Sequence, residues 1–199
     1  MRCNRIDGNR AVIPRQICWI IVAALLVLAS LSSCLTSSSS EEEKSSFSLR
    51  FYPSAATLAG VDSTATVDIV VDKAVNLIAA KVTVKFNPSI FEVTNLEIVG
   101  TDFVFYRHGA DPYVLDESVD NASGVVEFSV GAMEGGFTGV TGGGTLARLT
   151  VKGKAAGTAR ITYANTGRDE IIFTQYSQTS ETGWLKVTPT LYSGTVEVK

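Results

Sequence analysis

The sequence of 199 residues has few of the side chains on which most enzymes and metal centres depend: three cysteines, one histidine and two tryptophans. Cys3 and Cys18 lie near the N-terminus, so a chain shortened there keeps only Cys34. A single thiol cannot form an internal disulfide, and it excludes zinc sites built on pairs of cysteines. The one histidine, His108, has no nucleophile motif around it, so nucleophilic catalysis is not predicted.

The sequence also lacks a basic cluster outside its N-terminal segment. Lysine and arginine number 17 against 20 acidic residues, and four of the arginines precede residue 16. Without residues 1–33 the counts are 13 and 19, which gives a net charge of −6. Because nucleic-acid binding depends on neutralising phosphates with positive charge, this acidic excess argues against a nucleic-acid partner.

One long hydrophobic run is present, and it lies near the N-terminus. Residues 17–31 carry no charge and follow a leader with four arginines. The run is shorter than the roughly 20 residues that a membrane-spanning helix needs, whereas a basic leader followed by a short apolar run is typical of a secretory signal. The alternative is an uncleaved N-terminal anchor, which would also place residues 35–199 outside the cytoplasm.

The run ends in Leu31, Ser32, Ser33 and Cys34. An apolar residue, two small residues and a cysteine in this order resemble the lipobox of bacterial lipoproteins. The resemblance implies cleavage before Cys34 and attachment of a diacylglycerol to its thiol. Leu35, rather than aspartate, at the next position is compatible with sorting to an outer membrane. We therefore expect an exported protein that is lipid-anchored at the cell surface or outer membrane.

This interpretation divides the chain into three segments. Residues 1–33 are the signal peptide with its lipobox. Residues 34–46 are the lipidated cysteine and a tether rich in serine and glutamate, which we expect to be flexible because residues 36–46 have no apolar side chain to bury. Residues 47–199 have the length of one domain, large enough to bury a core without disulfides.

The hydrophobic pattern of residues 47–199 has a period of two and nowhere sustains the helical period of about 3.6. In residues 81–86 the two valines and the phenylalanine alternate with Lys81, Thr83 and Lys85. Short alternating runs separated by turn residues predict an antiparallel sandwich, and the glycine-rich residues 131–144 are expected to form a loop or flap. The expected strands are residues 48–52, 65–71, 74–79, 81–86, 91–99, 103–107, 126–130, 145–151, 158–163, 171–174 and 185–198, the last split near Pro189.

Three stretches resemble the cohesin family, whose fold is similar to that of several cellulose-binding modules. They are VNLIAA at residues 75–80, FNPSIFEV at 86–93 and GTLARLTVKGKAAG at 144–157. The resemblance extends over nearly all of residues 47–199. It implies an all-β fold, an antiparallel jelly-roll β-sandwich of about nine strands. It also implies a partner: a dockerin, which is a small calcium-loaded helical module on another protein.

The resemblance further implies a partner-binding face on two strands. Its residues here would be Lys81, Thr83, Lys85, Glu127, Ser129 and, at the rim, Met133. Cohesins that dock cellulases often carry asparagine and aspartate where this chain has Ala79 and Lys81. A lysine in place of an acidic hydrogen-bond acceptor should prevent binding of those partners. We expect a surface-anchored scaffolding module, without enzymatic activity or cofactor, that captures dockerin-type extracellular proteins, with polysaccharide-degrading enzymes as candidates.

Other interpretations remain open at this point. A module that binds polysaccharide directly would present a row of exposed aromatic residues. Outside the leader the only tryptophan is Trp184, and the tyrosines at 106, 113, 163, 176 and 192 show no regular spacing. The acidic loop expected at residues 111–120 offers carboxylates for calcium, but its spacing does not follow the EF-hand pattern, so no metal site is predicted. The strand face could also be a solvated surface that binds nothing.

Overall fold

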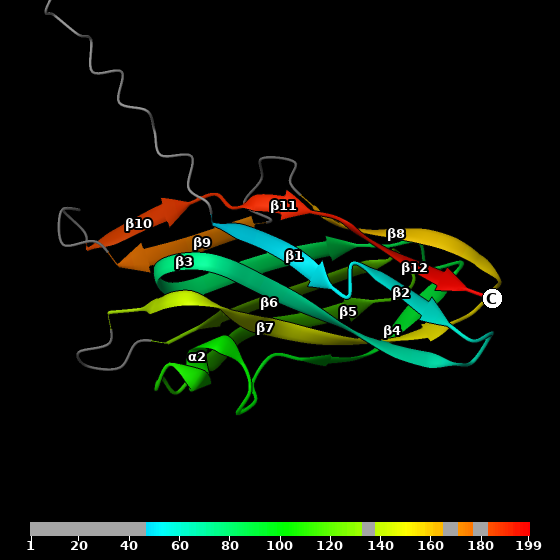
Figure 1. The fold of residues 1–199 in the computed structure, drawn as a ribbon, viewed down its shortest axis with the longest axis horizontal. Helices are drawn as coiled ribbons and strands as arrows, with labels where there is room; N and C mark the ends of the chain where they lie inside the picture. The colour runs from blue at the N-terminus through cyan, green and yellow to red at the C-terminus, as the bar shows by residue number, and fades with distance from the viewer. Residues whose placement is uncertain (1–46, 133–137, 165–170, 177–182) are drawn as a thin grey trace, which may run out of the picture. The chain divides into compact units, whose positions relative to one another are not determined.

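The computed structural model describes residues 47–132, 138–164, 171–176 and 183–199 (Figure 1). The described residues belong to one compact unit. The expected lipidation site Cys34, the signal peptide, the tether and the expected contact Met133 lie outside the described residues. Within the described ranges, none of the helices has the length and hydrophobicity needed to cross a bilayer.

Strand is the main secondary structure of the described residues, and the one helix has four residues, which confirms the predicted all-β fold class. The described residues contain twelve strands rather than about nine. The elements are β1 (Ser48–Tyr52), β2 (Ala55–Leu58), β3 (Thr64–Lys85), β4 (Phe91–Glu97), α2 (Val104–Arg107), β5 (Tyr113–Asp120), β6 (Val125–Gly131), β7 (Val140–Gly153), β8 (Gly157–Tyr163), β9 (Ile171–Tyr176), β10 (Trp184–Val187), β11 (Thr190–Tyr192) and β12 (Gly194–Val198).

β3 is a single strand of 22 residues that takes part in both layers of the sandwich. Residues 64–71 pair with β7, and residues 77–85 pair with β6 and β9. Between these halves the pairing register shifts twice, and Lys73 and Asn76 have φ values of 54° and 51°. Such irregularities bend a strand from one sheet into the other. The three strands expected at residues 65–86 are therefore one strand with a corner.

The two layers share β3. One layer has the order β4, β7, β3, β1, β11, and the other has β5, β6, β3, β9, β10. The last residues of β3 also pair with β8, which continues through β12 to β2. The pairs are antiparallel except for β1 with β11 and β2 with β12, which are parallel.

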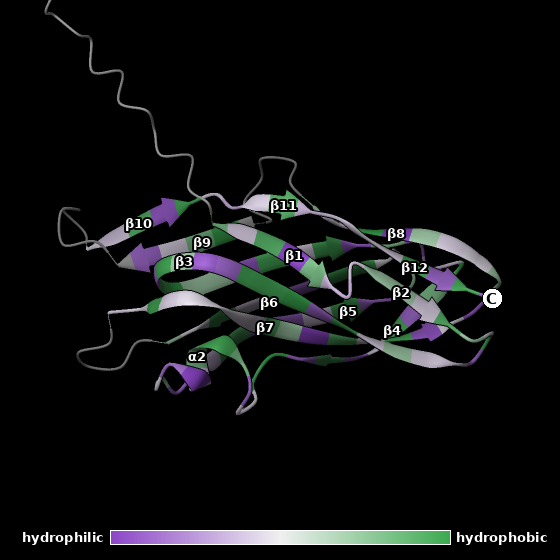
Figure 2. Ribbon diagram, in the orientation of Figure 1, coloured by the Kyte–Doolittle hydropathy of each residue, from purple (hydrophilic) through white to green (hydrophobic). Residues whose placement is uncertain are grey.

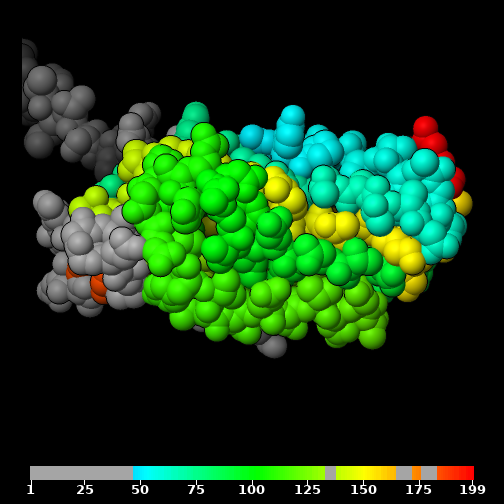
Figure 3. Space-filling view, turned by 90° about the horizontal axis from the view of Figure 1, so that it is seen from below, coloured from blue at the N-terminus to red at the C-terminus, as the bar shows by residue number. Residues whose placement is uncertain are grey.

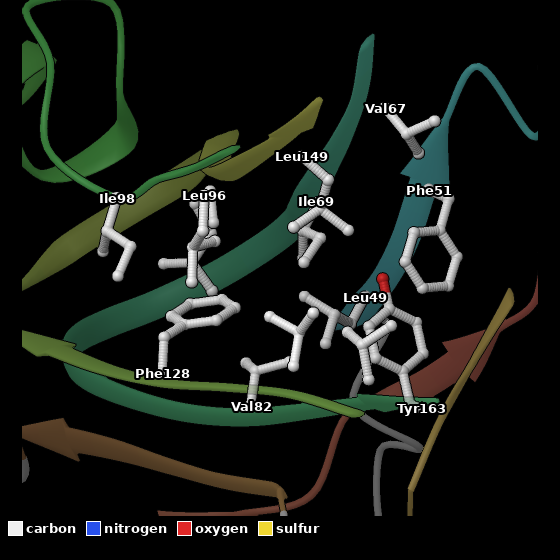
Figure 4. Packing of buried hydrophobic residues seen from close by; sticks show 14 of the residues in the cluster. Leu49, Phe51, Val67, Ile69, Val82, Leu96, Ile98, Phe128, Leu149 and Tyr163 are labelled. Carbon is white, nitrogen blue, oxygen red and sulfur yellow. The ribbon is translucent and has the colours of Figure 1, made fainter. Parts of the chain in front are cut away.

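The core lies between the two layers. Leu49, Ile69 and Leu149 come from one sheet and Val82 and Phe128 from the other, and Figure 4 shows their side chains pointing toward one another. All five are fully buried. Burying a side chain of this kind stabilises a fold by roughly 1.5–3 kcal/mol. The alternation that places these residues inside is visible as green and purple bands along β3 and β7 in Figure 2.

Three local predictions are wrong. Residues 103–107 were expected as a strand but form α2, in which the amide of Arg107 donates to the carbonyl of Phe103 at 3.0 Å. A short apolar run cannot be assigned to strand or helix by periodicity alone. The acidic stretch expected as a loop is the strand β5. The expected glycine-rich loop is strand from Val140 onward, where a Cβ on Gly143 would lie 2.7 Å from the carbonyl oxygen of Val71.

Tyr163 at the end of β8 is an unusual core residue. Its ring stacks on Phe51, with 4.4 Å between the ring centroids. Its hydroxyl is buried and has no hydrogen-bond partner in the described part of the chain. Burial raises the pKa of Tyr163 well above its usual range. A buried hydroxyl without a partner lowers stability by about 1–3 kcal/mol relative to a solvated one.

Tyr163→Phe is therefore expected to raise the free energy of unfolding by about 1 kcal/mol, because it keeps the stacked ring and removes the unpaired hydroxyl. Urea unfolding of residues 43–199 measures this change. Tyr52→Phe is the matched control: Tyr52 is 62% exposed, so its hydroxyl is solvated and its removal should change stability by less than about 0.5 kcal/mol. A clear loss of stability in Tyr163→Phe would show that the hydroxyl has a stabilising partner.

Candidate functional site

The predicted face residues lie together on the outer side of three neighbouring strands. In the ladder between β3 and β6, Lys81 is opposite Ser129 and Thr83 is opposite Glu127. On the other side of β6, Asp116 is opposite Ser129 and Ser118 is opposite Glu127. Cross-strand partners share one face of a sheet. We call this surface the β6 face and define it as Lys81, Thr83, Lys85, Asp116, Ser118, Glu127 and Ser129.

The core determines which residues point outward on β3 and β6. Val82, Val84, Val126, Phe128 and Val130 are fully buried. Because successive side chains on a strand point to opposite faces, the residues between them must point away from the core. The sequence pattern therefore correctly predicts the outward direction of Lys81, Lys85, Glu127 and Ser129.

Thr83 differs from this expectation in its exposure. Its side chain belongs to the outer face, yet the residue is only 2% exposed. Its Oγ1 donates a hydrogen bond to Oε1 of Glu127 at 3.1 Å. Thr83 therefore presents no exposed surface to a partner. It instead fixes the position of the carboxylate in the middle of the face.

Charge is distributed unevenly across the β6 face. Lys81 and Lys85 are on β3, Glu127 is in the centre, and Asp116 is on β5. Within the described part of the chain, neither lysine forms an ion pair. The opposite sheet contrasts with this, because there Arg148 pairs with Asp68 at 2.7 Å. The lysines of the β6 face are thus available to an incoming acidic group.

Asp120, at the end of β5, stabilises the turn that connects β5 to β6. Its carboxylate accepts hydrogen bonds from the hydroxyl of Ser123 at 2.6 Å and from the amide of Ala122 at 2.9 Å. The hydroxyl of Ser123 is the main cause that lowers the pKa of Asp120. This carboxylate holds the turn at residues 121–124, so it contributes to the position of β5 beside β6.

Exposed apolar residues on β5 adjoin the β6 face and were not predicted. Leu115 is 65% exposed, and Tyr113 and Val114 are each more than a third exposed. A register shift between Val114 and Asp116 inserts Leu115 as an extra residue. In Figure 3 the green atoms of the stretch containing α2 and β5 form much of the visible surface. The only signal in the sequence is the run Tyr113-Val114-Leu115, which is a run of strand-forming residues before the acids.

The acidic residues considered for calcium are not gathered into a loop. Asp116 and Glu117 are consecutive on β5, so their side chains point to opposite sides of the strand. Among the residues that the structure describes, no group of three or more histidine, cysteine, aspartate or glutamate side chains is placed to hold a metal ion. His108 is exposed after the end of α2.

The same fold occurs in solved cohesin structures. The seventh ScaB type I cohesin from Pseudobacteroides cellulosolvens has a TM-score of 0.56 at 14% identity, covering 77% of this chain and 92% of that chain. A non-cellulosomal cohesin from Archaeoglobus fulgidus has a TM-score of 0.55 at 12% identity, covering 77% and 91%. The cohesin–dockerin complex Coh-OlpC–Doc435 from Clostridium thermocellum gives 0.55 at 14% identity, covering 80% and 98%.

No protein-family model and no curated protein matches this sequence. The structural likeness nevertheless covers more than three-quarters of the chain in each of these three comparisons. Residues 47–199 therefore have the β-sandwich fold of cohesin domains.

Proposed function

We propose that the domain is a protein-binding scaffolding module that captures a dockerin-like module through the β6 face. The observation that carries the proposal is the arrangement of this face: cationic and acidic side chains from three strands lie on one surface, and exposed apolar side chains of β5 adjoin it. The fold supports the same function, because Coh-OlpA–Doc918 and Coh-OlpC–Doc435 from Clostridium thermocellum are cohesin–dockerin complexes. The proposed function requires only non-covalent contact, without a catalytic group or cofactor.

The components of the face suit different parts of a protein interface. Exposed Leu115 and Tyr113 provide apolar area of the kind that carries binding energy when it is buried in a complex. Lys81 and Lys85 provide positive charge, which selects partners by electrostatic complementarity. Glu127 is already held by Thr83 before binding, so less conformational freedom is lost in a complex. The partner should accordingly present acidic groups toward β3.

We further propose that lipid on Cys34 holds the exported domain at the cell surface or outer membrane. Each methylene of a buried acyl chain contributes roughly 0.8 kcal/mol, and more than one chain gives stable attachment. The serine- and glutamate-rich residues 34–46 would separate the lipid from residues 47–199. Partners captured there, with polysaccharide-degrading enzymes as candidates, would be kept close to the cell that secretes them.

Lys81→Asp combined with Lys85→Glu is expected to weaken partner binding at least about tenfold, because both cations on one side of the face become anions. The partner is obtained by capture from the secreted proteins of the host on residues 43–199. Its affinity for wild-type and variant domains is then measured by calorimetry. The melting temperature should change by less than about 2 °C, since neither lysine is buried.

Lys73→Asp combined with Lys199→Glu is the matched control for this experiment. It makes the same change in net charge at exposed positions outside the β6 face. The control should bind with wild-type affinity. The proposal fails if the captured protein has no dockerin-like calcium-loaded helical module. It also fails if the face variant binds as tightly as the wild type.

Cys34→Ala tests the anchor separately in the full chain. The wild-type protein should partition into the detergent phase with a mature mass that includes a diacylglycerol, whereas the variant should be unprocessed or released. Detergent phase separation and mass spectrometry measure the two properties. Cys18→Ala, a cysteine substitution within the leader, should be processed like the wild type. Unchanged partitioning and mature mass in Cys34→Ala would reject the lipoprotein assignment.

A further inference from the structure

A surface groove lies at the end of β1, on the sheet that does not carry the β6 face. It has a volume of about 470 Å³ and is lined by residues 50–54, Tyr192 and Ser193. The groove is lined by the end of β1 and by the connection from β11 to β12, and both segments can be followed in Figure 1. Sites for small ligands commonly have volumes of about 300–1,000 Å³, so the groove is large enough for one.

Two exposed tyrosines line this groove. Tyr52 is 62% exposed and Tyr192 is 54% exposed. Leu49 and Phe51 point into the core, so Arg50 and Tyr52 point outward from β1. Tyr192 is opposite Arg50 in the parallel ladder and shares this outer face.

Polar groups in fixed positions accompany the two rings. The Nε of Arg50 donates to a carboxylate oxygen of Asp72 at 2.5 Å, and the guanidinium carbon lies 5.7 Å from the centre of the Tyr52 ring. A guanidinium has five N–H donors, so some remain for a ligand. Arg160 donates to the hydroxyl of Ser193 at 3.1 Å. The groove thus combines aromatic surface with oriented hydrogen-bonding groups.

The floor of the groove is tightly packed. The amide of Thr195 donates to the carbonyl of Ser54 at 2.9 Å. A Cβ on Gly194 would lie 3.1 Å from that carbonyl oxygen and 3.2 Å from the Cβ of Phe51. The turn after β1 and the start of β12 are therefore held against each other. The groove is already formed without a ligand, which reduces the entropy lost on binding.

We propose that this groove binds a short stretch of neutral, β-linked hexose units in an extracellular polysaccharide. The flat C–H faces of such pyranose rings stack on aromatic rings. Their hydroxyls accept hydrogen bonds from Arg50, and they can donate to or accept from the hydroxyls of Ser54 and Ser193. A purely apolar ligand would cover the remaining N–H donors of Arg50 without offering them a hydrogen-bond acceptor. Among the residues that line the groove only Arg50 is charged, and its ion pair with Asp72 balances that charge, so a neutral chain suits the groove.

The glycan site is independent of protein docking. Arg50, Tyr52 and Tyr192 are on the outer side of one sheet, and the β6 face is on the outer side of the other. Changes in the groove should therefore leave partner capture unaltered. The two proposals can fail separately.

Affinity electrophoresis tests the proposal directly. Residues 43–199 are run in native gels that contain barley β-glucan or glucomannan, with α-linked dextran for comparison. At least one β-linked glycan should retard the wild type. Tyr52→Ala and Tyr192→Ala should each weaken binding of the matching hexasaccharide at least about tenfold by calorimetry, and Tyr52→Phe should keep it because stacking needs only the ring.

Tyr106→Ala is the matched control, since Tyr106 is a tyrosine of α2 that is 49% exposed and lies outside the groove. It should bind like the wild type, and circular dichroism should show all variants folded, because the altered side chains are about half exposed or more. The proposal is overturned if no β-linked glycan retards the wild type. It is also overturned if both groove variants retain affinity, or if Tyr106→Ala weakens binding as much as they do.

Discussion

The course of β3 from one sheet to the other is the constraint on which the other strands depend. Its first half sets the register of β1 and β7, and its second half sets that of β6 and β9. The corner is closely packed, because a Cβ on Gly139, at φ 99°, would lie 2.2 Å from the carbonyl carbon of Asn76. A slip of one residue in the second half would bring Lys81, Thr83 and Lys85 to the core side in place of Val82 and Val84. The β6 face therefore exists only in the observed register.

The two outer faces of the sandwich use their charges in different ways. On the sheet containing β7, Arg148 donates to Asp68 at 2.7 Å and to Asp102 at 3.1 Å, and the bond to Asp68 is the main cause that raises the pKa of Arg148. These contacts tie the segment before α2 to the sheet. On the β6 face the lysine charges serve no such internal purpose in the described residues. The ion pairs that stabilise the sheet therefore do not involve the lysines of the proposed docking face, and these lysines can vary without loss of the fold.

The sequence predicts those features of the structure that depend on neighbouring residues in the chain. Strict alternation predicts β1 and β6 correctly, together with the outward direction of Lys81 and Glu127. The hydrophobic pattern does not predict β5, because both sides of this strand are exposed and its apolar residues therefore do not alternate with polar ones. The burial of Thr83 depends on neighbouring strands and is not visible in residues 81–86.

The groove was beyond prediction for a similar reason. Tyr52 and Tyr192 are separated by most of the domain in sequence, and only the parallel pairing of β1 with β11 brings them to one face. A search for regularly spaced aromatics along the chain cannot detect such a pair.

The two tyrosines lie on the sheet opposite the β6 face, across a core of fully buried side chains. Because a close-packed core changes little when a surface ligand binds, a glycan in the groove and a protein on the β6 face can be held at the same time. With both sites on one domain, a captured enzyme would be brought to its polysaccharide by an increase in effective concentration alone, with no change in the affinity of either site.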